Sequence, residues 1–117
     1  MGKLSTHVLD IMQGKPGSGI QVTLYAVEAG RKTLLKSAVT NHDGRCSAPL
    51  LEGAALKVGQ YELVFAVGDY FDAQGIVLPS PKFIDRVTLA FGVADPEQNY
   101  HVPLVVSPWA YSTYCGS

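Results

Sequence analysis

The side chains of this chain best suited to proton transfer near neutral pH are its three histidines, His7, His42 and His101. An unperturbed imidazole has a pKa of about 6.5, so its acid and base forms are both available. His7 and His101 lie in candidate strands, whereas His42 lies in the turn 41–44 and is expected to be exposed. A histidine on a strand is more often a hydrogen-bonded structural residue, so residue type alone leaves its role open.

Other kinds of catalytic centre find little support in the sequence. Cys46 and Cys115 form no CxxC pair and are too few for a disulfide framework, so we expect two free, inert thiols. A Gly-x-Ser-x-Gly elbow, which would indicate a serine hydrolase, is absent from the sequence. A zinc site would need a third ligand beside His7 and His101, and His42 belongs to a different turn. We therefore expect neither a metal site nor a cofactor.

The segments that would position these residues are predicted β-strands. Apolar residues alternate with others along Ile20–Ala26, Tyr61–Val67 and Val87–Phe91, as a strand with one buried face requires. Shorter or weaker candidates are Leu4–Asp10, Thr33–Thr40, Tyr100–Val106 and Trp109–Tyr114. The total of about seven strands, separated by turn residues, is typical of a sandwich.

One short segment, 69–74, is predicted to be helical, with Asp69 as its N-cap and Gly75 as its stop. Trp109 and Tyr111 share one face of the last candidate strand and are expected to pack inside the protein. Many strands with one short helix predict an all-β fold, a two-layer antiparallel sandwich.

Length and composition predict one domain, residues 1–117, that associates with copies of itself. Hydrophobic residues make up 47% and charged residues 16%, which suggests that another subunit covers some apolar surface. The net charge of -1 includes no long run of one sign, so nucleic acid is not expected as a partner. With no secretory leader and no apolar run of about 20 residues, we expect a cytoplasmic protein without a membrane partner.

Four segments carry motifs in a recognisable order: Leu4–Asp10, Thr40–Arg45, Tyr100–Leu104 and Tyr111–Ser117. With the segment Gly59–Leu63 between them, their order and spacing resemble the transthyretin-like hydrolase family, the 5-hydroxyisourate hydrolases. The similarity runs through the whole chain. It implies a sandwich of two four-stranded sheets, and a homotetramer, built as a dimer of dimers, whose central channel houses the active sites.

The reaction that this resemblance implies is hydrolysis of 5-hydroxyisourate to 2-oxo-4-hydroxy-4-carboxy-5-ureidoimidazoline, in urate degradation. His7 and His101 match the catalytic acid–base pair, and His7 also matches a substrate contact. Arg45 matches the residue that holds and polarises the substrate, and Tyr114 matches a third substrate contact. Ser117 matches a catalytic serine in the hydrogen-bond network around the attacking water. The family works without a metal or cofactor.

The C-terminal motif departs from the family pattern, which usually ends Tyr-Arg-Gly-Ser, because Cys115 stands in place of the arginine. If strand alternation continues to the terminus, residue 115 points away from the side of Tyr114, so a substrate contact need not be lost. We expect a normal fold, with reduced activity if the lost cation anchored Ser117.

Two other classes of function remain open at this point. A carrier such as transthyretin shares the fold and binds thyroid hormone in the same channel, so fold alone does not separate the two. The histidine and arginine set favours the enzyme, because a carrier needs none of it. A structural module that binds a protein partner would need neither histidine and would tolerate loss of Arg45.

Overall fold

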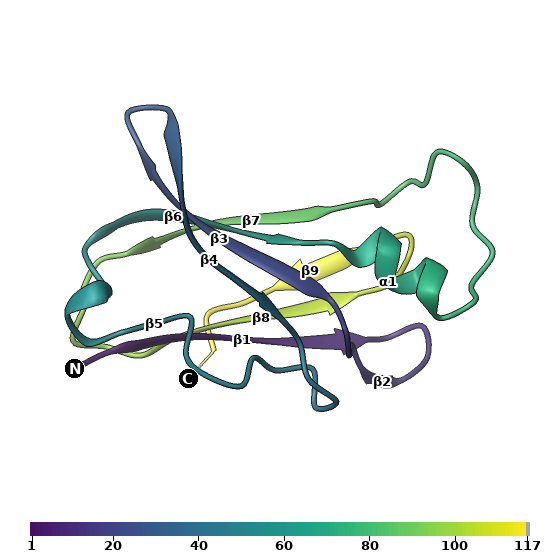
Figure 1. The fold of residues 1–117 in the computed structure, drawn as a ribbon, viewed down its shortest axis with the longest axis horizontal. Coiled ribbons are helices and arrows are strands. Elements are labelled where there is room, and N and C mark those ends of the chain that lie inside the picture. The colour runs from purple at the N-terminus through teal and green to yellow at the C-terminus, as the bar shows by residue number, and fades with distance from the viewer. Residues whose placement is uncertain (117) are drawn as a thin grey trace.

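The computed structural model describes residues 1–116, which form nine strands in two stacked sheets (Figure 1). One sheet has the strand order β2-β1-β8-β9, with β5 also paired to β1, and the other has the order β4-β3-β6-β7. The first consists of β1 (Lys3–Asp10), β2 (Lys15–Pro16), β5 (Leu51–Glu52), β8 (Tyr100–Val106) and β9 (Tyr111–Thr113). The second consists of β3 (Gln21–Glu28), β4 (Arg31–Val39), β6 (Gly59–Phe65) and β7 (Val87–Val93). The predicted two-layer β-sandwich is confirmed.

The first sheet differs in two details from the expected four antiparallel strands. It has five strands because the two-residue strands β2 and β5 pair with opposite ends of β1. In addition, β1 and β8 run parallel. Parallel neighbours need a long connection between them, and here that connection contains the whole second sheet. The first strand of the chain and its last long strand therefore lie side by side (Figure 1).

The core lies between the sheets and follows from the alternation in the strands. Val22 and Leu24 on β3, Leu63 and Phe65 on β6 and Leu104 on β8 are all fully buried. Burying such a side chain stabilises the fold by about 1.5–3 kcal/mol relative to leaving it exposed. Alternate residues of the same strands must then point outward, and these outward positions are where chemistry can be placed.

The helix α1 (Val67–Ala73) begins earlier than predicted. Its N-cap is Ala66, without a side-chain cap, so the prediction of Asp69 as N-cap is wrong. Packing sets the start instead, because Val67 is buried and a Cβ on Gly68 would lie 2.5 Å from Asp85 Oδ1. Gly75 ends the helix as predicted, with φ +77. Neither α1 nor the 3-10 helix Gly53–Ala55 has the length and apolar character to cross a membrane, and they are the helices of the described chain.

The aromatic residues before and in β9 are not packed inside the sandwich, which corrects the prediction for Trp109 and Tyr111. Their side chains are 55% and 48% exposed. Trp109 precedes β9, in a loop, and its ring lies 6.1 Å from that of Phe83. The strand itself is short and lies at the edge of its sheet, so it offers little cover.

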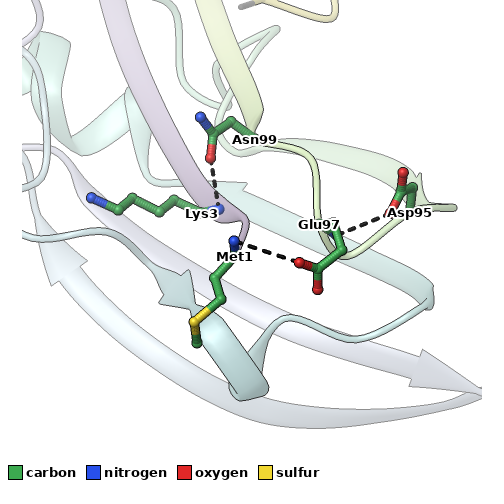
Figure 2. Close-up of polar contacts among 5 residues, drawn as sticks. All are labelled: Met1, Lys3, Asp95, Glu97 and Asn99. Atoms are coloured by element: carbon green, nitrogen blue, oxygen red, sulfur yellow. Dashed lines mark hydrogen bonds and ion pairs between the residues drawn. The ribbon is translucent and has the colours of Figure 1, made fainter.

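The start of β1 is attached to the turn between β7 and β8, as Figure 2 shows. The Lys3 amide donates to Asn99 Oδ1 at 3.0 Å, and the Gly2 amide donates to the Pro96 carbonyl at 3.1 Å. The Met1 amine lies 3.5 Å from Glu97, but both groups are exposed, so this ion pair adds little. These contacts support one parallel register between β1 and β8.

Candidate active site

The outer face of β1 supplies the first histidine of the candidate site. Leu4, Thr6 and Val8 on this strand are buried, so alternation turns Ser5 and His7 outward, where both are half-buried. The same alternation on β8 buries Val102 and Leu104 and turns His101 outward. Both histidines therefore lie on the same outer face of one sheet.

The parallel register brings the two histidines together. Ser5 lies opposite His101, and His7 lies opposite Pro103. The two imidazole rings have their centroids 6.5 Å apart and are tilted by 30°. The Ser5 hydroxyl lies 2.8 Å from His101 Nδ1. Two residues that are far apart in the sequence are thus held at a distance that a small polar substrate and a water molecule can span.

A tight turn delivers Arg45 to the other side of β1. Asn41 Oδ1 accepts hydrogen bonds from the amides of Asp43 and Arg45, at 2.9 and 3.2 Å. Gly44 has φ +75, and a Cβ there would lie 2.5 Å from the Val8 carbonyl oxygen. The Val8 amide donates to the Gly44 carbonyl at 2.9 Å, which docks the turn on β1. As a result, Arg45 forms an antiparallel bridge with His7.

The C-terminal motif lies on the far side of β8. The Gly116 amide donates to the His101 carbonyl at 2.8 Å, in a bridge that continues the β8–β9 register. Extended through residues 114 and 115, this register would set Tyr114 opposite Pro103 and Cys115 opposite Val102, so that their side chains point to opposite sides; Cys115 is exposed. Gly116 has a steric role too, because a Cβ there would lie 2.8 Å from His101 Cδ2. Ser117 lies outside the described residues.

Electrostatics favour neutral imidazoles. Burial lowers the pKa of His7, and the Arg45 cation lowers it further, against a backbone hydrogen bond and the charge of Asp43, which raise it. Burial is also the largest cause of the lowered pKa of His101, followed by the charges of Arg45 and His7. Each ring therefore has a lone pair that can accept a proton at neutral pH.

Cavities flank this face on two sides. A cavity of about 440 Å³ between β7 and the C-terminal segment includes His101, Tyr114 and Cys115 in its wall. A smaller one of about 190 Å³ is lined by Ser5, Arg45 and residues 46–49. On the face between them, His7 and His101 are partly exposed in a single chain.

Of the residues predicted from the sequence, His7, Arg45, His101 and Tyr114 come to this face, whereas His42 does not and is 88% exposed as expected. Sequence reasoning missed Ser5 and the steric role of Gly116. Ser5 was detectable, because it lies two residues before His7 and so shares its face. Across residues 1–116, no three His, Cys, Asp or Glu side chains are grouped so that they could hold a metal ion.

This chain is similar in sequence and in fold to proteins of one known family. The model of the HIUase/Transthyretin family matches residues 4–116. The 5-hydroxyisourate hydrolase of Ralstonia nicotianae is 59% identical over 117 residues, covering 100% of both chains. A solved 5-hydroxyisourate hydrolase of Klebsiella pneumoniae is 33% identical, covers 100% of both chains and superposes with a TM-score of 0.80.

A transthyretin is similar in fold but more distant in sequence. Sea bream transthyretin, solved in complex with thyroxine, superposes with a TM-score of 0.86. It is 25% identical, over 97% of this chain and 94% of that one. The family model covers nearly the whole chain, and the relatives match it from end to end. This chain is therefore a member of the HIUase/Transthyretin family.

Proposed function

We propose that this chain is a 5-hydroxyisourate hydrolase, which opens a ring amide of 5-hydroxyisourate to give 2-oxo-4-hydroxy-4-carboxy-5-ureidoimidazoline. The observation that carries the proposal is the convergence of His7, His101 and Arg45 on one outer face. The full-length similarity to the Ralstonia nicotianae hydrolase supports it. The proposal treats residues 1–117 as one hydrolase domain that acts in urate degradation.

Hydrolysis of a ring amide needs an activated water, a proton for the leaving nitrogen and positive charge beside the developing oxyanion. Two imidazoles can supply the first two, since one neutral ring takes a proton from water and becomes an imidazolium, and the other ring passes this proton on to the leaving nitrogen. They lie 6.5 Å apart, which leaves room for the reacting atoms between them.

Arg45 supplies the third requirement. Its planar guanidinium can donate two parallel hydrogen bonds to adjacent carbonyl and ring nitrogen acceptors of a purine-like substrate. Its charge also disfavours protonation of both histidines, which keeps them available as bases. Tyr114, 64% exposed beside the same face, is proposed as a further substrate contact. Ser117 is proposed to bind the attacking water.

We propose that the site is completed in a homotetramer, a dimer of dimers. The partial exposure of His7 and His101 supports this. A neighbouring subunit that covered their face would exclude bulk water from the reaction. Exposed apolar side chains lie at the C-terminal end of β1 and in the turn after it, at Leu9, Ile11 and Met12. Cys46 and Cys115 are unpaired, which suits the reducing cytoplasm, where we place the protein.

A carrier of the transthyretin type is the second candidate, favoured by the similarity to the thyroxine-bound protein. A carrier channel for an apolar ligand would gain nothing from two partly desolvated histidines beside an arginine. The site chemistry therefore favours the hydrolase.

The test is the decay of freshly generated 5-hydroxyisourate, followed by ultraviolet absorbance with and without the protein. We expect faster decay with the parent protein, and decay at the spontaneous rate with Arg45→Ala. His42→Ala is the matched control, since His42 is exposed in the same turn, and it should keep the parent rate. Spontaneous decay with the parent protein would refute the proposed function, and thyroxine binding by that inactive protein would then support a carrier.

A further inference from the structure

We propose that Ser5 is a positioning residue for His101, whose hydroxyl holds Nδ1 so that Nε2 is the nitrogen that exchanges protons with water and substrate. This inference rests on the proposed function, because it assigns the orientation of one histidine of that site. The resemblance to the family assigns no role to Ser5.

The first support is the hydrogen bond itself. Ser5 Oγ and His101 Nδ1 are 2.8 Å apart, a length typical of a strong hydrogen bond. Both residues are paired in the β1–β8 ladder, and both side chains are half-buried. The contact is therefore set by the strand register, which the attachment of β1 to the turn 94–99 helps to define (Figure 2).

The second support is steric. The ring of His101 has one edge toward each neighbouring segment, since Nδ1 faces Ser5 on β1 and Cδ2 faces Gly116 beyond β9. No room for a side chain exists between Gly116 and this ring. With both inner atoms of the ring fixed in this way, Nε2 and Cε1 form its outer end. The nitrogen presented to the site is then Nε2.

The third support is the chemistry of a hydroxyl as a partner. A serine hydroxyl can donate to a neutral Nδ1 and can accept from a protonated one by rotating about a single bond. It can therefore stay bonded to His101 before and after Nε2 takes up a proton. A carboxylate in this place would instead favour the imidazolium and raise the pKa of the ring. Ser5 thus orients the ring without preventing its use as a base.

The experiment compares Ser5→Ala with Ser5→Thr and with Ser112→Ala. Removing the hydroxyl should lower kcat by roughly 10-fold. This is the smaller end of the losses seen in metal sites when a hydrogen-bond partner that orients a histidine is removed. KM should stay within about twofold, since Ser5 acts through His101. Ser5→Thr keeps a hydroxyl and should restore most of the rate. Ser112 also faces outward, opposite Val105 on β8, and its change to alanine should leave kcat unchanged.

A second readout does not depend on turnover. The chain has three histidines, so ¹⁵N-labelled imidazoles can be assigned and followed by NMR in parent and variant proteins. We expect the His101 nitrogen shifts of Ser5→Thr to match those of the parent, and the Nδ1 shift to move in Ser5→Ala, because Nδ1 then loses its hydrogen bond. His42, which is 88% exposed, should not change and serves as the internal control.

The outcomes separate this inference from the proposed function. Parent kcat together with unchanged His101 nitrogen shifts in Ser5→Ala would overturn the positioning role while leaving the hydrolase intact. A parent protein without hydrolase activity would refute the proposed function. In that case the NMR comparison alone decides whether Ser5 orients His101, since changed shifts support that claim and unchanged shifts overturn it.

Discussion

The outer faces of the two sheets carry ionisable groups in opposite arrangements. On the β4-β3-β6-β7 sheet, Lys32 Nζ lies 2.7 Å from Glu62 Oε1, and each charge is stabilised by the other. On the β1-β8-β9 sheet, His7 and His101 face each other beside Arg45, and burial and positive charge disfavour their protonation. The inner faces of both sheets are mainly apolar, with the buried Thr6 and Asp10 of β1 as polar exceptions.

The difference shows what a site adds to a sandwich. The Lys32–Glu62 pair is an ion pair on the sheet surface, which a sandwich can carry without any catalytic role. Burial of His7 and His101 removes solvation from their charged forms and so lowers the pKa of both rings. Packing of the sandwich does not by itself require two histidines to be placed in this way. Titratable groups with a shifted pKa, gathered on one outer face of a sheet, are typical of a functional site.

The largest effect is expected from His101→Asn. Asparagine keeps polarity and similar size but cannot transfer a proton, so turnover should fall by about 10²–10⁴-fold. Circular dichroism and the oligomeric state should match the parent, because His101 faces away from the core. Initial rates of 5-hydroxyisourate decay measure the change, and a variant with the parent rate would remove His101 from the mechanism.

The next largest effect is expected from Gly116→Ala. The added methyl would lie 2.8 Å from His101 Cδ2, so the ring must move from the position in which Nδ1 meets Ser5, and kcat should fall by about 10-fold. Thermal unfolding measured alongside should show only a small change, since the site is at the surface. Gly92→Ala is the control, because its Cβ would meet nothing closer than 3.9 Å, and it should retain the parent rate. Equal rates for both variants would contradict the steric role of Gly116.

A smaller effect is expected from mild acid. Because burial and the Arg45 charge lower the pKa of both site histidines, the acidic limb of activity should have its midpoint below pH 6.5. The unfolded chain, with ordinary histidines, binds more protons just below pH 6.5, so the stability from these neutral rings is present above that pH and lost as pH falls.

The pH dependence of kcat/KM measures the acidic limb of activity. The pH dependence of denaturant unfolding measures the stability that is lost as pH falls. In Arg45→Gln, NMR titration should show the pKa of His101 moving upward toward 6.5, because one cause of its lowering has been removed. An acidic limb above pH 6.5 in the parent protein would contradict the proposed electrostatics.

The sequence predicts those parts of this site that depend on local pattern. Alternation in β1 is enough to turn His7 outward, and the Asn-x-Asp-Gly turn is enough to place Arg45 just after a bend. The roles came from resemblance to a family, since a histidine on a strand is by itself no evidence of catalysis.

The parts that the sequence did not predict depend on contacts between distant segments. The hydrogen bond from Ser5 to His101 requires the parallel register of β1 and β8, which alternation does not specify. The start of α1 is set by the packing of Gly68 against Asp85 rather than by a capping residue. The exposure of Trp109 follows from its place in a loop beside an edge strand. Cys115 is the converse case, since the register supports the expectation that it faces away from Tyr114.

The smallest effect is expected on the sheet without the site, from Lys32→Met. Lys32 is half-exposed, so its ion pair is worth about 0.2–1 kcal/mol, and stability should fall by about that amount. The loss should lie at the upper end of this range. Glu62 Oε1 is buried, and no other described residue donates a hydrogen bond to it. Urea unfolding measures the change, and Glu62→Gln in the same background should recover part of it by removing the unpaired charge. Hydrolase activity should be unaffected, since charges on this sheet take no part in the reaction. A fall in kcat comparable to that of Gly116→Ala would show that the two outer faces are coupled and that the contrast between them is wrong.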